Sequence, residues 1–130
     1  MSLLLSICLS VPGVCEPAHL EQMESVVISE SDDPVERWRR LVETEFPVSE
    51  IDTAMCVIRH ESAGNPDADN PRSSARGLFQ ILGSLWAPHF GVSRSDLYDP
   101  ATNTRIAHDI WQKQGWWAWS PYKRGLCRSG

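Results

Sequence analysis

The residues with the clearest chemical potential lie in one short segment, residues 59–66, which reads RHESAGNP. Glu61 stands at the end of an otherwise apolar stretch, directly before a loop rich in Gly, Asn and Pro. A carboxylic acid among apolar neighbours has a raised pKa, because burial penalises its charged form. Such an acid can hold a proton at neutral pH and donate it to a leaving oxygen, as the cleavage of a glycosidic bond requires. The alternative is a glutamate at a helix end that makes a structural ion pair.

A second motif, GLFQI, occupies residues 77–81. Gln80 lies inside this apolar run, where an amide without a partner would be costly, so we expect it to face a ligand or to satisfy backbone groups of the loop. Ser62 could hydrogen-bond near the acid or a ligand, or could simply cap the helix. Gly77 permits a close approach of the backbone, either to a ligand or within a turn.

Glu61-Ser62 at a helix end, followed about fifteen residues later by GLFQI, resembles the soluble lytic transglycosylase domain of the lysozyme-like superfamily. The resemblance covers roughly residues 35–128. It implies a mainly α fold: a small lysozyme-like helical domain with a short irregular hairpin or loop and a glycan-binding groove. It also implies cleavage of the β-1,4 bond between N-acetylmuramic acid and N-acetylglucosamine in peptidoglycan, with 1,6-anhydro product ends. By the same resemblance, Glu61 is the single catalytic acid and base, and Ser62 and Gln80 bind substrate.

Two other functions remain open for the same residues. Asp67 and Asp69 follow Glu61 closely, and one of them could position a water molecule and make the protein a hydrolytic muramidase on the same fold. The spacing of these two residues among Asn and Pro also fits simple loop chemistry. The remaining possibility is a glycan-binding module without catalysis, built on the aromatic tail.

The chain has six tryptophans, which is a heavy load for a small domain. Trp38 and Trp111 fall on faces that we predict to be buried. The tail holds an aromatic cluster of Trp116, Trp117, Trp119 and Tyr122. Because sugars present apolar C–H faces that stack on indole rings, we predict that Trp117, Trp119 and Tyr122 bind substrate. The alternative is that the tail tryptophans only seal the core.

Helical periodicity and capping residues predict four helices that position these groups. They cover residues 33–46, 49–63, 84–90 and 99–115, with an irregular hairpin or loop over 63–76 and no periodicity after 116. In the second helix, Ser49 is expected to be the N-cap and Asp52 to complete a capping box. The buried stripe of this helix flanks Glu61.

Charge and hydropathy divide the chain unevenly. The first 33 residues hold six acids and no Lys or Arg, and the remainder has eleven acids against twelve Lys and Arg, with no basic stripe that would indicate nucleic-acid binding. We predict a signal peptide over 1–18, an acidic linker over 19–33 and the enzymatic domain over 34–130. No basic residue precedes the apolar run, so a disordered apolar tail is the alternative. We expect a secreted or cell-envelope monomer whose partner is the peptidoglycan glycan strand.

The four cysteines divide between the leader and the domain. Cys8 and Cys15 fall in the leader, whereas Cys56 and Cys127 remain, and in an exported protein this even remainder predicts a disulfide. The alternative is a buried thiol and a free tail thiol. No metal site is expected, because His60 has no second histidine at the spacing of a helical zinc site and because Cys56 and Cys127 have no near neighbours of ligand type. No cofactor is expected either.

Overall fold

A computed structural model describes residues 32–128 of the 130-residue chain. The predicted signal peptide and almost all of the predicted acidic linker lie outside these residues. The described part is mainly helical, as predicted. Its α-helices are α2 (Arg39–Glu45), α3 (Ile51–Glu61), α4 (Gly83–Phe90), α5 (Pro100–Gln114) and α6 (Ser120–Lys123). Its 3-10 turns are η1 (Glu36–Trp38), η2 (Val48–Glu50), η3 (Arg94–Tyr98) and η4 (Gly115–Ala118).

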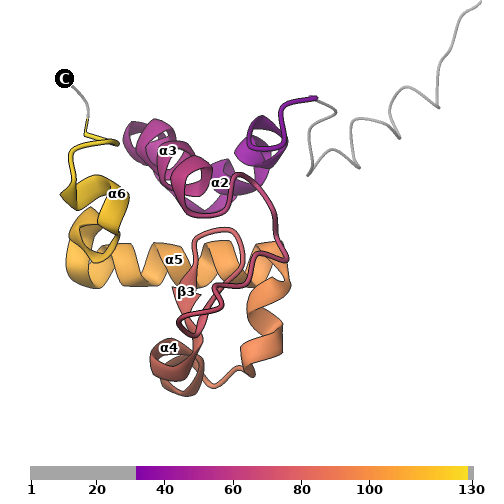
Figure 1. Cartoon of the computed structure of the whole chain (residues 1–130). Coiled ribbons are helices and arrows are strands. Elements are labelled where there is room, and N and C mark those ends of the chain that lie inside the picture. The colour runs from indigo at the N-terminus through magenta and orange to yellow at the C-terminus, as the bar shows by residue number, and fades with distance from the viewer. Residues whose placement is uncertain (1–31, 129–130) are drawn as a thin grey trace, which may run out of the picture.

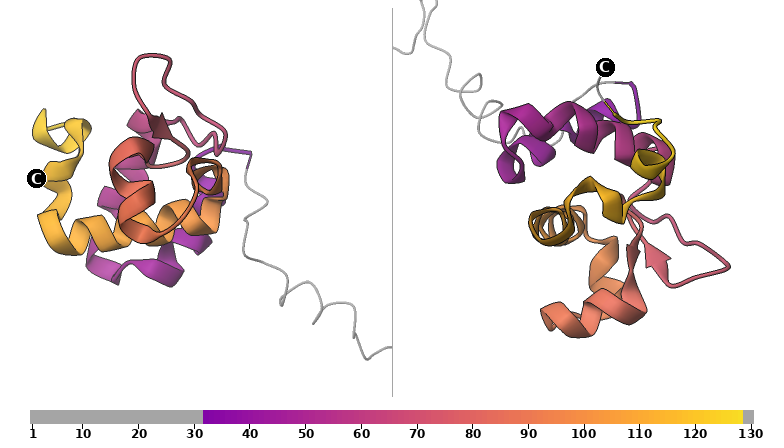
Figure 2. Two further views of the ribbon diagram at one scale, coloured as in Figure 1. Left: turned by 90° about the horizontal axis from the view of Figure 1, so that it is seen from below. Right: turned by 90° about the vertical axis from the view of Figure 1, so that its left-hand side faces the viewer.

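Helix α5 runs through the middle of the molecule and separates two groups of elements (Figure 1). Helices α2 and α3 lie on one side, whereas the hairpin of β2 (Ala75–Arg76) and β3 (Ile81–Leu82) lies on the other side with α4. The C-terminal end of α5 leads to α6, which contacts α3. The loop of residues 62–74 projects from the body beside the strands (Figure 2). Between residues 32 and 128, no helix has both the length and the apolar character that a membrane span requires.

The first two helices both begin later than predicted. Asp33 Oδ1 accepts hydrogen bonds from the backbone N–H of Val35 at 2.8 Å and of Glu36 at 3.3 Å. The residue that caps the 3-10 turn η1 is nevertheless Val35, and α2 starts only at Arg39. The prediction that Ser49 caps the second helix is wrong. Its hydroxyl donates to Glu50 Oε2 at 3.0 Å, and α3 begins only after the 3-10 turn η2. This turn shifts the helix entry toward the C-terminus.

The C-terminal end of α3, which carries Glu61, is fixed against the first segment of the domain. Gly64 has a φ of +84°, and a Cβ at this position would lie 2.2 Å from the backbone oxygen of Pro34. Trp38 Nε1 donates to the carbonyl oxygen of Gly64 at 2.8 Å. Only glycine allows this close approach, so the position of the helix end follows from the backbone contact.

The GLFQI turn is held by a buried side chain on α5. Asn103 accepts a hydrogen bond from the backbone N–H of Phe79 at 2.9 Å and donates to the carbonyl oxygens of Arg76 and Leu97, each at 2.9 Å. A Cβ on Gly77 would lie 2.3 Å from the oxygen of Leu97. We expected Gly77 to allow a close approach of the backbone either to a ligand or within a turn. The structure shows the second, because Gly77 packs closely against Leu97 in a turn.

The C-terminal tail packs into the core and is bonded to α3. Trp116 is buried and stacks on Phe46 with ring centroids 5.4 Å apart. A disulfide joins Cys56 of α3 to Cys127 across 71 residues, as predicted. The tail forms η4 and α6, which the sequence analysis missed, because elements of four residues are too short to show helical periodicity.

Candidate active site

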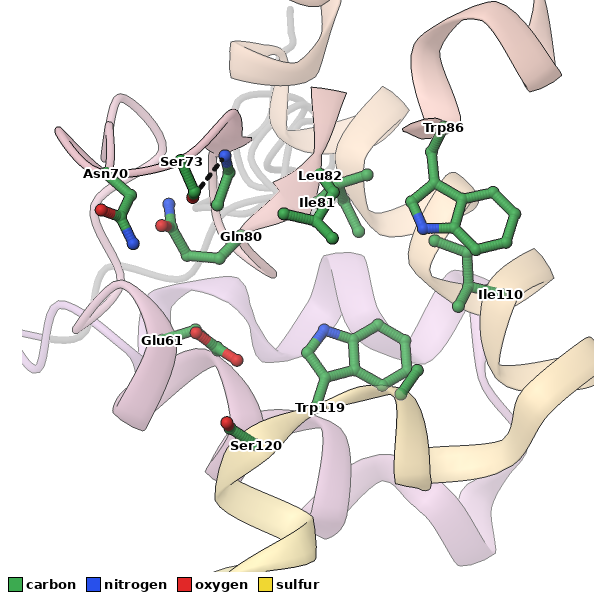
Figure 3. Close-up of a pocket in the computed structure, with 12 residues that line it drawn as sticks. Glu61, Asn70, Ser73, Gln80, Ile81, Leu82, Trp86, Ile110, Trp119 and Ser120 are labelled. Carbon is green, nitrogen blue, oxygen red and sulfur yellow. Dashed lines mark hydrogen bonds between the residues drawn. The ribbon is translucent and has the colours of Figure 1, made fainter. Parts of the chain in front are cut away.

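A pocket of about 240 Å³ lies where α3, the hairpin, α4 and the tail meet (Figure 3). Its lining residues are Glu61, Asn70, Ser73, Ala75, Gln80, Ile81, Leu82, Trp86, Ile110, Ala118, Trp119 and Ser120. This volume is below the roughly 300–1,000 Å³ of pockets that enclose a whole small ligand. The pocket can therefore hold only part of a longer ligand, which must run past its ends.

The carboxyl group of Glu61 points into this pocket, between Gln80 and Ser120 (Figure 3). Burial raises its pKa to about 7, and the positive charge of Arg124 opposes the rise only in part. Among residues 32–128, no side chain forms an ion pair or a hydrogen bond with this carboxyl group. The structural ion pair that was the alternative for Glu61 is therefore not formed in the described part of the chain. Near neutral pH, a large fraction of the Glu61 side chains is protonated, and this proton is not engaged in a hydrogen bond to another described residue.

Among the described residues, Glu61 is the one acid that lines the pocket. Asp69 forms an ion pair with Arg76 at 2.9 Å, and the backbone of Asp67 is held by the side chain of Asn65 at 2.9 Å. Both aspartates belong to the loop and neither lines the pocket. This geometry matches the loop-chemistry interpretation of these two residues.

Gln80 lines the pocket and also braces the loop, so it combines the two roles that its sequence position left open. Its Nε2 donates to the carbonyl oxygens of Ala68 and Gly77, each at 3.2 Å. Its side-chain oxygen remains as an acceptor. The φ of Gln80 is 51°, a conformation that costs a non-glycine residue of order 1 kcal/mol and that clusters at functional sites. The hairpin turn thus holds this amide at the pocket despite backbone strain.

Trp119 forms a wall of the pocket next to Glu61. It is 4% exposed, and its Nε1 donates to the carbonyl oxygen of Phe79 at 2.9 Å. This bond satisfies the polar atom of the indole, so the ring presents an apolar surface to the pocket. The ring thereby contributes to the apolar surroundings that favour the protonated form of the acid.

The structure does not bring the other predicted substrate-binding residues into the pocket. Ser62 Oγ donates to the carbonyl oxygen of Ile58 at 3.3 Å and accepts from the N–H of Gly64 at 3.2 Å, which is the helix-capping alternative. Trp117 and Tyr122 contact each other outside the lining, with ring centroids 5.3 Å apart. Because of the way η4 and α6 pack, Trp119 points into the pocket and these two rings do not. The sequence alone does not reveal which way each ring points.

Sequence reasoning missed several residues that the fold brings to the pocket, above all Trp86. The ring of Trp86 closes the end of the pocket opposite Ser120 (Figure 3). Neighbours on α4 hold it, with His89 and Phe90 at centroid distances of 5.4 and 5.8 Å. Asn70, Ser73 and Ser120 add polar groups. The signal for Trp86 was its place soon after Gln80, on a short helix that starts at the hairpin.

One group of metal-ligand type exists in the described residues, away from the pocket lining. The ligand atoms of Cys56, His60 and Cys127 lie within 4.8 Å of one another. The prediction that Cys56 and Cys127 have no near neighbours of ligand type is wrong, because Cys56 precedes His60 by one helical turn. Both sulfur atoms are consumed by the disulfide, so the group cannot bind a metal as it stands.

A small helical domain whose cleft carries one acid of raised pKa beside an indole wall defines a lysozyme-like protein. The chain belongs to the Transglycosylase SLT domain family, whose sequence profile matches residues 43–114. It is also 28% identical over 98 residues to a lysozyme C-like protein of Dictyostelium discoideum, and the match covers 73% of this chain. The chain spans about half of that relative, 49% of its length. No solved structure gives a significant match. At the level of the family, these similarities support degradation of peptidoglycan by a lytic transglycosylase or lysozyme-like enzyme.

Proposed function

We propose that this protein is a peptidoglycan lytic transglycosylase with Glu61 as its general acid and base. The observation that carries the proposal is the half-buried carboxyl of Glu61, which has no ion-pair or hydrogen-bond partner among residues 32–128 and whose pKa of about 7 keeps it partly protonated in the cleft at neutral pH. General acid catalysis is most effective when the pKa of the acid lies near the working pH. The leaving oxygen of a glycosidic bond needs this proton donor.

In the proposed reaction, Glu61 donates its proton to the oxygen that bridges N-acetylmuramic acid and N-acetylglucosamine. The bond between that oxygen and the anomeric carbon of N-acetylmuramic acid then breaks, and positive charge develops on this carbon. The 6-hydroxyl of the same muramic acid attacks the anomeric carbon and gives its proton to the carboxylate of Glu61. The products are a 1,6-anhydro end and a free 4-hydroxyl, and Glu61 has regained its proton.

The presence of one acid in the lining supports the anhydro product over hydrolysis. Two-carboxylate glycosidases place their acids about 5–9.5 Å apart across the bond, so that the second acid can act as a nucleophile or activate water. Within residues 32–128, all the other residues that line the pocket are uncharged. The neighbouring acetamido oxygen of the substrate can stabilise the cationic centre instead, as in substrate-assisted glycosidases. Hydrolysis by an unassisted water molecule remains the rival outcome.

The pocket also offers groups that can hold a sugar next to the acid. Trp86 supplies an aromatic surface for the C–H face of a ring. The free acceptor of Gln80 and the side chains of Asn70 and Ser73 can bind hydroxyl or acetamido groups. Because the pocket is open and small, we propose that the glycan strand runs from Trp86 past Glu61 and onto the tail.

The test is digestion of purified sacculi, with mass analysis of the released muropeptides. We expect anhydro ends, which are lighter than reducing ends by one water. The Glu61→Gln variant should lose about 10²–10⁴-fold in rate, the usual contribution of a positioned general acid or base. Glu43→Gln changes an exposed glutamate on α2 and serves as the matched control. Reducing ends would show a muramidase, and full activity of the Glu61 variant would exclude the assignment.

We further propose that the protein acts outside the cytoplasm, in the cell envelope or as a secreted protein. The substrate of the family lies there, and the disulfide between Cys56 and Cys127 fits an oxidising compartment. The same proposal assigns peptidoglycan strands as the partner of a monomeric enzyme that needs no cofactor. Fractionation of cells that produce the tagged full-length chain tests the location, and its exclusive recovery with cytoplasmic markers would contradict it.

A further inference from the structure

Aromatic and cationic side chains form an exposed surface around the segment that carries Trp119. Trp117 is 54% exposed and meets the edge of Tyr122. The guanidinium carbon of Arg128 lies 4.7 Å from the ring centroid of Trp117 and 5.6 Å from that of Tyr122. Lys123 and Arg124 are exposed at the end of α6. We call these five residues the tail patch.

The cations of the tail patch have no carboxylate within ion-pair distance in the described part of the chain. The ion pairs of residues 32–128 involve other basic side chains. Arg128 instead donates to the backbone oxygens of Tyr122 at 3.0 Å and Lys123 at 2.7 Å. These bonds orient the guanidinium without neutralising it. Positive charge that is concentrated in this way, with no ion-pair partner among residues 32–128, attracts anionic ligands.

Part of the tail patch lies near the Glu61 end of the pocket. Residues 118–120 line the pocket; Trp117 directly precedes them, and Tyr122 follows Ser120 by two positions. Arg124 is close enough to Glu61 for its charge to lower the pKa of that acid. In Figure 3, Ser120 and Glu61 lie at one end of the pocket and Trp86 at the other. A strand that leaves the pocket at the Glu61 end therefore passes next to the tail patch.

We infer that the tail patch binds the carboxylate-bearing peptide stem of a muramic acid residue next to the scissile bond. This inference rests on the proposed function, since it names a second recognition element of the same strand. The lactyl group of muramic acid carries a short peptide with methyl groups and free carboxylates. The carboxylates complement the unpaired cations, and the methyl groups can pack on the exposed indole of Trp117. An anionic phosphate polymer would share the charge but would offer less apolar surface to the indole.

The test compares binding of stem-bearing glycan strands with binding of strands that an amidase has stripped of their stems. The full chain with Glu61→Gln is used, so that the strands stay intact. We expect about three- to tenfold tighter binding of the stem-bearing strands, from two or three solvent-exposed charged contacts. Adding Lys123→Gln and Arg128→Gln should abolish this preference. Adding Arg94→Gln and Arg105→Gln, which remove the same charge from exposed positions on η3 and α5, should leave it intact.

A second variant guards against local unfolding of the tail. Trp117→Ala removes the indole but leaves the backbone hydrogen bonds of Arg128 in place, and it should also reduce the stem preference. Thermal unfolding of every variant shows whether the domain remains folded. Increasing salt should weaken the preference, because the Debye length, about 10 Å at 0.1 M ionic strength, becomes shorter and the attraction between exposed charges is screened more strongly.

Three results would overturn the inference: equal binding of both kinds of strand, a preference that survives in the tail-patch variants, or a preference that follows wall phosphate polymers. Cleavage of sacculi by the unaltered protein separates this inference from the proposed function. Cleavage without any dependence on the stem contradicts only the tail-patch inference. Absence of both cleavage and binding contradicts both proposals.

Discussion

Replacing Glu61 with Gln should stabilise the folded protein in a strictly pH-dependent way. The pKa of Glu61 rises from 4.5 to about 7 on folding. Between these two values the native state binds more protons than the unfolded state, so the free energy of unfolding falls as the pH rises through this window. Each pKa unit is equivalent to about 1.4 kcal/mol. Because the side chain keeps partial access to solvent, we expect the total effect to be about 2 kcal/mol.

The measurement is denaturant unfolding of the unaltered protein and the Glu61→Gln variant at pH 4 and pH 8. The variant lacks the titrating group, so its advantage should be absent or small at pH 4 and reach about 2 kcal/mol at pH 8. At about 4–8 °C per kcal/mol for a domain of this size, the thermal midpoints should differ by about 8–16 °C at pH 8. The pH 4 data subtract the intrinsic difference between glutamate and glutamine packing. Glu43→Gln should show no such pH dependence.

An advantage of Glu61→Gln that is the same at both pH values would refute the reasoning, because it would show that the carboxyl titrates alike in the folded and unfolded chains. An advantage that is larger at pH 4 would reverse the sign and refute it more strongly. Either result would remove the protonated acid on which the proposed chemistry depends.

Three more predictions concern the surroundings of the acid. Arg124→Gln removes a charge that lowers the pKa of Glu61, so the basic limb of the kcat/KM pH profile should move to higher pH; an unmoved limb would contradict the electrostatic argument. Asn103→Ala removes three buried hydrogen bonds and should cost about 3 kcal/mol in urea unfolding, whereas a loss below about 1 kcal/mol would show that the turn is held otherwise. Replacing Cys56 and Cys127 together with Ser should cost about 4 kcal/mol by the chain-entropy model for a 71-residue loop, and thermal unfolding that matches the unaltered protein would exclude that role.

The fold class and the long elements could be predicted, because they depend on signals of one or two helical turns. The stripe that ends in Glu61 and the Asp99-Pro100 start of α5 are local patterns, and the structure follows them. The start of α3 was misjudged, because Ser49 lies inside the 3-10 turn η2 instead of capping the helix. Local sequence does not decide between these two arrangements.

The pocket was predicted less well than the fold, because its walls come from parts of the chain that lie far apart in sequence. Glu61 and Gln80 belong to recognisable motifs, and both reach the pocket. Which tail aromatic faces the acid depends on the rotation of η4 and α6, and only Trp119 of the predicted tail aromatics does so. Trp86 has no local signature beyond its short amphipathic helix, so its place at the pocket follows only from the path of the hairpin.

The position of Trp119 beside Glu61 has a consequence for when the raised pKa of Glu61 arises during folding. Glu61 lies near the middle of the chain, whereas the ring that shields it is contributed by residue 119, close to the end of the described part. Without residues 118–120 the carboxyl would face water on that side, and the desolvation that raises its pKa would be smaller. Glu61 is in place once α3 has formed. Its carboxyl gains the full shielding that raises its pKa only when the tail packs over it. The bond between Cys56 and Cys127 then locks that arrangement.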